Sequence, residues 1–197
     1  VYKRQACTNR STSSEQDEVR HWNNVLQQIN ALLLENKAQQ TLDLAKQTLP
    51  EILESAEKNG TTDTLIYYAR KIFNACGNNY INTKQYKDGI DYMDSIGNHP
   101  LIREHCPHEL LSFKAGLNQL YGNNPEAVRL AEDYLQLPVC TSANDFIRQA
   151  EIISGVYMYS GNNLPKAIQI LEKAIDVYRK GAVSYTHLRA HETSQDL

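Results

Sequence analysis

The chain has 197 residues, a formal net charge of −3 and a hydrophobic content of 41%. This length suits one compact domain or one short solenoid. The mild acidity and the absence of a Lys- and Arg-rich stripe argue against a nucleic-acid partner, and the lack of a long apolar run argues against a membrane span within this sequence. Only nine glycines and six prolines argue against a β-rich architecture, so helices are expected throughout.

The two ends of the sequence differ in character from the rest. Residues 1–5 and 182–197 resemble translated sequencing-adapter DNA and do not continue the flanking pattern. We expect them to be non-native and exclude them from fold reasoning, the alternative being a native strand and tail. The side chains of residues 6–14 are mostly short and polar and leave little apolar surface to bury, which predicts a flexible leader.

The first predicted helical pair spans about residues 15–59. From Glu15 on, apolar residues recur three and four apart, a spacing typical of one helix face. These residues are Val19, Trp22, Val25, Leu26, Ile29, Leu32 and Leu33. A second helix follows Asn36 and stops at Asn59-Gly60, and Pro50 either kinks it or starts a new turn.

The second predicted pair, about residues 62–98, has the most regular pattern. Its apolar and small residues are Phe73, Cys76, Gly77, Tyr80, Tyr86, Gly89, Met93, Ile96 and the closing Pro100. Thr62 or Asp63 can cap the first helix of this pair. The linker from Pro100 to Pro107 is expected to be irregular.

Two further pairs follow, at about residues 108–137 and, after the cap-rich stretch 141–144, at about 145–181. Their turns, Gly-Asn-Asn-Pro-Glu-Ala at 122–127 and Gly-Asn-Asn-Leu-Pro-Lys-Ala at 161–167, are near copies about 39 to 40 residues apart. Expected inner positions are Ala127, Leu130, Ala131, Tyr134, Ala150, Ile153, Tyr157, Ala167, Leu171 and Ala174. Gly181 is expected to end the last helix.

The spacing in the second pair resembles a tetratricopeptide repeat, an antiparallel helical hairpin of about 34 residues. The resemblance covers about residues 15–181 and implies an all-α, right-handed α-solenoid of about four such hairpins, because one hairpin cannot bury its apolar face alone. It also implies that a peptide or helix binds in a concave groove lined by the first helix of each pair.

Groove positions of this family fall on Lys71, Asn74, Asn78 and Asn82, with Tyr159 as a further candidate. Three Asn at four-residue intervals place amide donors and acceptors in one row, although a solvated helix face is the preferred explanation of the pattern. Family members that grip a terminal carboxylate carry Lys at the position of Asn74 and Asn at that of Asn78, and only the second matches.

The twelve tyrosines divide into two groups. Those near packing positions, expected to be core or half-buried, are Tyr80, Tyr86, Tyr92, Tyr157 and Tyr178. Those that suit the groove better are Tyr67, Tyr68 and Tyr159.

Reactive residues give no enzyme or cofactor signature. Among His99, His105, Cys106 and His108 the spacing matches no known zinc pattern, so loop residues are the preferred interpretation. Phosphate-binding, metalloprotease and serine-hydrolase motifs are missing, so no activity, metal or cofactor is expected. Cys76 is expected in the core.

Ala6-Cys7, followed by a Ser/Thr-rich stretch, resembles the processing site of bacterial lipoproteins. Cys7 is therefore either a lipidated N-terminus or an ordinary cysteine. A lipid at Cys7 is the only membrane attachment that the sequence suggests.

Together, the two resemblances imply a non-catalytic protein-interaction scaffold of the bacterial cell envelope, lipid-anchored or periplasmic, with a cytoplasmic location as the alternative. Its expected partner is a peptide or a helical protein. The alternative function is the extracytoplasmic sensor region of a truncated membrane histidine kinase or a related regulator. We also expect self-association, because Ile168, Leu171 and Ile175 should be partly bare.

Overall fold

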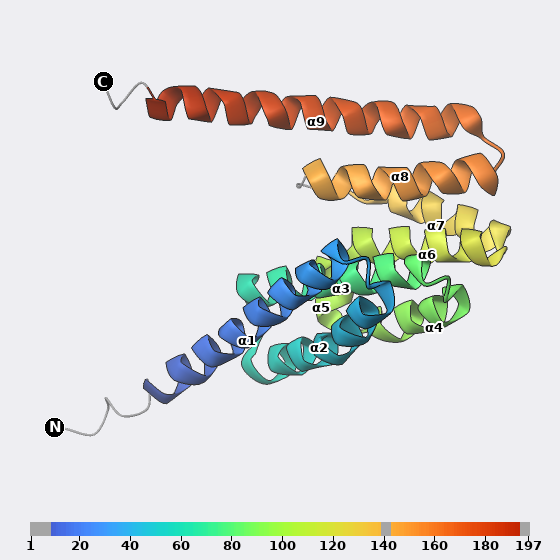
Figure 1. Cartoon of the computed structure of the whole chain (residues 1–197). Coiled ribbons are helices and arrows are strands. Elements are labelled where there is room, and N and C mark those ends of the chain that lie inside the picture. Colours follow the sequence, from blue (N-terminus) through green and yellow to red (C-terminus); the bar gives the residue numbers. More distant parts are fainter. Residues whose placement is uncertain (1–8, 139–142, 194–197) are drawn as a thin grey trace. The chain divides into compact units, whose positions relative to one another are not determined.

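The computed structural model describes residues 9–138 and 143–193 (Figure 1). In these two stretches the protein has nine helices and no strand, which confirms the expected all-α class. The chain divides into two compact units, Val1–Cys106 and Pro107–Leu197.

The first unit contains two helical hairpins and a short closing helix. Its helices are α1 (Asn9–Leu34), α2 (Ala38–Asn59), α3 (Asp63–Asn82), α4 (Tyr86–Ile96) and α5 (Pro100–His105). α3 packs against both α1 and α2, and it also contacts α4 and α5. The first helix of the second hairpin is therefore covered by both helices of the hairpin before it.

The second unit repeats this relation. Its helices are α6 (Pro107–Tyr121), α7 (Asn124–Gln136), α8 (Ala143–Tyr159) and α9 (Leu164–Thr193). α8 packs against α6 and α7, and α9 packs against α8 (Figure 1). Small side chains such as Ala115, Ala131 and Ala167 are fully buried in its core, which lets the helices approach closely.

All four hairpins turn in the same way. The residue two positions before the second helix has a positive φ: Asn36 (55°), Lys84 (60°), Gly122 (95°) and Asn162 (44°). The N–H of the following residue then donates to a carbonyl five residues back in the first three hairpins and six back in the fourth. Local backbone geometry therefore recurs although only the last two turns are similar in sequence.

Most of the predicted core positions are buried. The regular second pair has its apolar residues inside, with Phe73, Cys76, Gly77, Tyr80, Gly89 and Met93 all buried. In the first pair, Thr41, Ala45 and Thr48 of α2 are buried too.

Two helix boundaries differ from the prediction, and one of the two alternatives at Pro50 is excluded. α1 begins at Asn9, so residues 9–14, expected in a flexible leader, are helical. Helix growth adds one hydrogen bond for each residue fixed, and this stretch contains neither Gly nor Pro to stop it. α2 is one helix through the exposed Pro50, so no new turn starts there. α9 includes Gly181 and ends at Thr193, so Gly181 does not terminate it.

The prediction of an irregular linker at residues 100–107 is also wrong, because α5 occupies most of this segment. Pro100 stands at the start of this helix, where its missing N–H costs nothing, and the His99 ring accepts the N–H of Leu101 at 3.2 Å. Leu101 and Ile102 are buried, which holds the short helix in place.

Candidate functional site

One face of α3 gathers the polar residues that the sequence singled out. Tyr67, Lys71, Asn74, Asn78 and Asn82 are spaced four, three, four and four apart, so they lie on one side of the helix. We call this set the α3 polar face. Lys71 and Asn82 are exposed, Asn78 is half-buried, and Asn74 is only 8% exposed. The first amide of the row is thus much less accessible than the two that follow it.

The aromatic end of the α3 polar face is held in place by its neighbours. Tyr67 is 52% exposed, and the Lys71 Nζ lies 5.8 Å from its ring centroid. Tyr67 also meets the Tyr68 ring edge-on, with centroids 5.2 Å apart, and Tyr68 in turn packs on Trp22 of α1 at 5.7 Å. An aromatic ring and a cation are therefore presented together on a supported surface.

Tyr68 itself was expected to suit the groove, and this is wrong. Its side chain is 7% exposed. Successive helix residues are rotated by about 100°, so Tyr68 points to the side of α3 that faces Trp22 while Tyr67 points outward.

The opposite side of α3 is a tightly packed anchor. Cys76 and Tyr80 are buried there against Tyr92 of α4, with the Cys76 Sγ 3.8 Å from the Tyr92 hydroxyl and the two tyrosine rings 5.4 Å apart. The Nζ of Lys46, from α2, lies 5.4 Å from the Tyr80 centroid. Burial raises the pKa of the Cys76 thiol to about 12, so this sulfur stays protonated and unreactive at neutral pH.

Two further contacts hold α3 in place. The Thr62 Oγ1 accepts the Leu65 N–H at 3.3 Å, so Thr62 is the cap that the sequence allowed. Near the middle of the helix, the Arg70 guanidinium donates to the His105 carbonyl at the end of α5. The α3 polar face therefore lies on a helix that is fixed at its N-terminus and near its middle.

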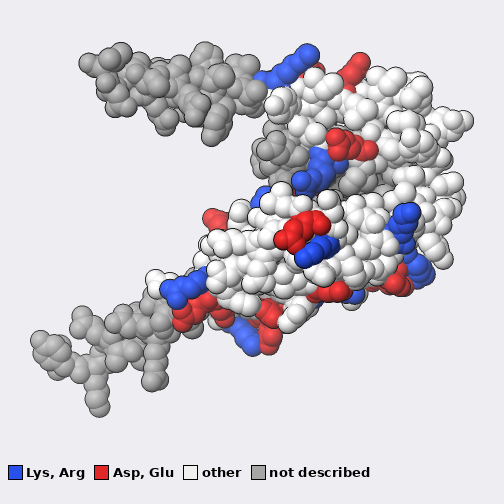
Figure 2. Space-filling model, viewed as in Figure 1, with Lys and Arg blue, Asp and Glu red and all other residues white. Residues whose placement is uncertain are grey.

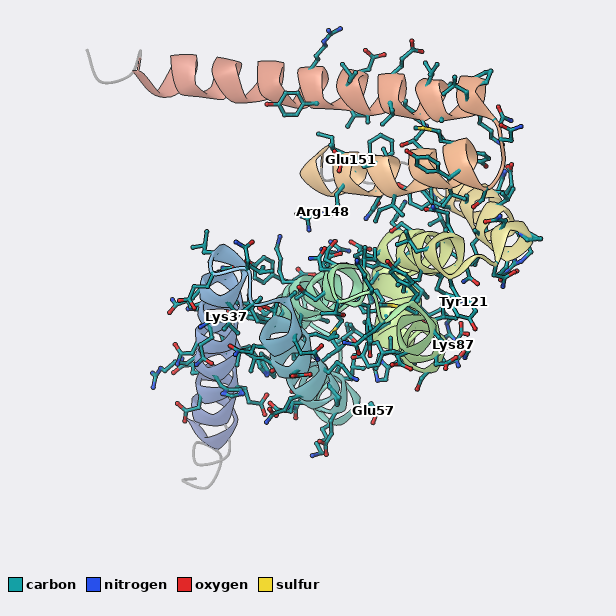
Figure 3. The ribbon with its side chains drawn as sticks, turned by 45° about the vertical axis from the view of Figure 1, so that its right-hand side comes forward. Lys37, Glu57, Lys87, Tyr121, Arg148 and Glu151 are labelled. Atoms are coloured by element: carbon teal, nitrogen blue, oxygen red, sulfur yellow. The ribbon has the colours of Figure 1, made fainter. Side chains whose placement is uncertain are left out.

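Tyr159 lies in the second unit, at the end of α8, and is 72% exposed. Arg148 and Glu151 are exposed on the same helix (Figure 3). Tyr178, expected to be half-buried at least, is 54% exposed, which is a correction. It follows the buried Ala174 by one turn of α9, on nearly the same side of the helix.

A second polar cluster surrounds Tyr157. The Nζ of Lys166, from α9, lies 4.5 Å from the Tyr157 ring centroid and bonds the Glu132 carboxylate of α7. Burial raises the pKa of Tyr157 to about 12, although the Lys166 charge acts in the opposite direction. Glu132 has its pKa lowered, chiefly by the hydrogen bond from Lys166. Lys166 and Glu132 thus pair with each other beside the ring, while the buried Tyr157 hydroxyl has no hydrogen-bond partner among the described residues.

A cleft of about 390 Å³ lies between α1 and α2. It is lined by the acidic residues Asp17, Glu18, Glu51 and Glu54 and by His21, Trp22, Ser55 and Lys58. Its charges pair internally, with Ser55 donating to Glu18 at 2.8 Å and Lys58 lying 2.6 Å from Glu54. The lining nevertheless carries four carboxylates against one lysine, so the cleft is acidic overall.

Among the described residues, no three His, Cys, Asp or Glu side chains converge as a metal site would require. No described helix combines the length and apolarity that crossing a bilayer demands. Basic and acidic side chains are interspersed on the face in view in Figure 2. Cys7, the residue considered for lipidation, lies outside the described residues, as does Cys140.

The sequence located the α3 polar face but not how accessible each member is. Helical periodicity places Lys71, Asn74 and Asn78 on one side, whereas the burial of Asn74 depends on neighbouring elements that periodicity does not specify. Nothing in the sequence indicated that Lys46 of α2 would extend to the rings of Tyr80 and Tyr92 behind this face.

Comparisons of the chain with protein-family models, with curated proteins and with solved structures found no match.

Proposed function

We propose that the protein is a non-catalytic binding module whose hairpins stack as a right-handed α-solenoid of the tetratricopeptide type, and that it holds an extended peptide along the α3 polar face. The stacking proposal is supported by the way α3 packs on both helices of the preceding hairpin, and α8 on both of its own. The shared left-handed turn supports it further. In such a stack each hairpin supplies the surface that its neighbour needs to bury.

The chemistry of the α3 polar face suits a peptide backbone. Each Asn amide offers both donors and an acceptor, so Asn78 and Asn82 can pair with N–H and C=O groups of an extended segment. Lys71 and Tyr67 add a cation beside an aromatic ring, which suits an acidic side chain next to an apolar one. This exposed combination of aromatic, cation and amides on one rigid helix is the observation that carries the proposal.

The position of Asn74 bears on which part of a peptide would bind. Members of the resembled family that hold a chain terminus carry Lys there, whereas this residue is a largely buried Asn. Without that second cation, a terminal carboxylate would lack its main partner. We therefore propose recognition of an internal segment rather than a C-terminus.

The test is selection of ligands from a displayed random peptide library, followed by affinity measurement for purified variants by fluorescence anisotropy. Lys71→Ala and Asn82→Ala should each weaken selected peptides by about tenfold, the equivalent of 1.4 kcal/mol. Lys58→Ala is the matched control, because it removes an equally exposed cation from α2 and should leave affinity within about twofold.

Amidating the C-terminus of a selected peptide should change its affinity little if an internal segment is bound. A library that yields no binder, or binders equally tight for all three variants, contradicts the proposal.

A further inference from the structure

Helix α9 carries an exposed apolar stripe beside the side that it buries. The stripe consists of Leu164, Ile168, Leu171, Ile175 and Tyr178, and we call it the α9 stripe. Ile168 is 47% and Ile175 49% exposed, whereas Leu171, at the border with the core, is half-buried. The residues that face the core are a different set, which includes Ala167, Ile170 and Ala174.

The spacing of the α9 stripe is that of a helix–helix seam. Its members follow one another at intervals of four, three, four and three residues, an average of 3.5. This is the spacing at which two helices keep their apolar seams in contact, and a row with such spacing is complementary to a copy of itself. Single exposed apolar residues are ordinary on protein surfaces, but a row of four exposed apolar residues with a half-buried fifth between them is not.

The charges along the open edge of the α9 stripe indicate the direction of pairing. Glu172 and Arg179 lie beside the stripe, both exposed, and the described residues include no ion-pair partner for either. Glu172 is three residues before Ile175 and Arg179 is four after it. A two-fold axis near Ile175 with antiparallel helices therefore places each Glu172 beside Arg179 of the other copy.

We propose that α9 pairs with α9 of a second copy of this chain, antiparallel and about a two-fold axis near Ile175. The contact is isologous, so each apolar residue and each charge is used twice. The pairing goes beyond peptide binding on α3 and does not depend on it, because no residue is shared between the two surfaces.

Sedimentation velocity of the full chain over a range of concentrations tests the pairing itself. The wild-type chain should convert from monomer to dimer as its concentration rises. Ile168→Asp and Ile175→Asp should each raise the dimer dissociation constant by about tenfold or more, because each places a charge in the apolar seam. Leu34→Asp is the control, since it changes an exposed aliphatic residue of α1 and should leave the constant unchanged.

Because both target residues are exposed, thermal melts followed by circular dichroism should show that these variants remain folded. A wild-type chain that is still monomeric at about 1 mM, the concentration at which an association of roughly 4 kcal/mol becomes visible, overturns the proposal. That outcome would mean that the α9 stripe is left to another partner.

Exchange of the two charges tests the antiparallel direction. Glu172→Arg and Arg179→Glu should each weaken dimerisation by about tenfold, because each brings like charges together twice. The double variant Glu172→Arg/Arg179→Glu restores opposite charges and should recover the wild-type constant to within about threefold. Single variants that dimerise like the wild type, or a double variant no better than the singles, reject antiparallel pairing at Ile175.

Discussion

Tyr80 in the first unit and Tyr157 in the second occupy matching places. Each lies on the first helix of the second hairpin of its unit, is 1% exposed and carries a lysine over its ring. Each also accepts, through its carbonyl, the turn N–H that precedes the next helix, from Gln85 at 3.1 Å and from Asn163 at 2.8 Å.

The lysines above the two rings come from different directions. Lys46 belongs to α2, the helix before, whereas Lys166 belongs to α9, the helix after. The additional partners also differ, since a thiol and a second tyrosine surround Tyr80 and a carboxylate lies near Tyr157. Ring burial is therefore a requirement of hairpin packing, while the polar partner is whatever long side chain can reach the site.

The sharpest way to test this equivalence is to remove both rings. Tyr80→Ala and Tyr157→Ala should each lower the free energy of unfolding by about 3–5 kcal/mol, the usual cost of deleting a buried aromatic side chain. Urea denaturation followed by circular dichroism measures the loss. Tyr121→Ala, at the exposed end of α6 (Figure 3), should change stability by less than about 0.5 kcal/mol. A small effect at only one of the two buried rings would show that the two positions are not equivalent.

Alkaline pH should separate the two clusters. The pKa of Cys76 rises from 9.0 to about 12 and that of Tyr157 from 10.0 to about 12, in both cases because of burial. The native state therefore retains protons that the unfolded chain has released. The free energy of unfolding keeps its full value below pH 9 and falls as the pH rises toward 12. Each group contributes a loss on the order of 1 kcal/mol per pH unit.

The order in which the two groups act gives the measurement. Urea denaturation between pH 9 and 10 should already show a decline, which Cys76→Ala makes shallower and Tyr157→Phe leaves in place. Above pH 10, Tyr157→Phe should reduce the slope. Stability that is flat across this range contradicts the inferred burial of the thiol proton.

Replacing each of two glycines of the second unit with alanine separates the effect of close helix packing from that of helix propensity. A Cβ added at Gly116 of α6 would lie 2.7 Å from the Ile152 Cγ2 of α8, whereas a Cβ at Gly155 meets nothing within 4 Å. Gly155→Ala should raise the unfolding free energy by about 0.5–1 kcal/mol. Gly116→Ala should lower it by about 1 kcal/mol, because overpacking outweighs the same propensity gain. Equal gains at both sites would indicate that α6 and α8 are not in close contact.

The smallest expected effect concerns the hairpin turns. Lys84 and Gly122 hold the same left-handed position, where only glycine is unstrained. Lys84→Gly should therefore stabilise the protein by about 0.5–1 kcal/mol, and Gly122→Ala should destabilise it by about 1 kcal/mol. Thermal melts of the two variants measure the opposite signs. A Lys84→Gly variant that melts lower than the wild type argues against a left-handed residue at this turn.

Much of the secondary structure could be predicted from local sequence. The apolar period from Phe73 to Met93 identified both helices of that hairpin and their buried sides, because period depends on helix geometry alone. The turn residues located the boundaries between paired helices, because turn formation also depends on local sequence. The misplaced boundaries at Asn9 and Gly181 are positions where a helix continues past residues that do not favour it.

The sequence by itself determined which side of each helix is apolar, where the chain turns, and that Lys71, Asn78 and Asn82 share a face of α3. Only the tertiary structure decided which neighbour covers each side. It buried Tyr68 against Trp22, left Tyr178 in solvent, and closed the first unit with a helix at Pro100. Periodicity is a property of one helix, whereas burial depends on pairs of helices, so a side chain at a border can be assigned only when its neighbour is known.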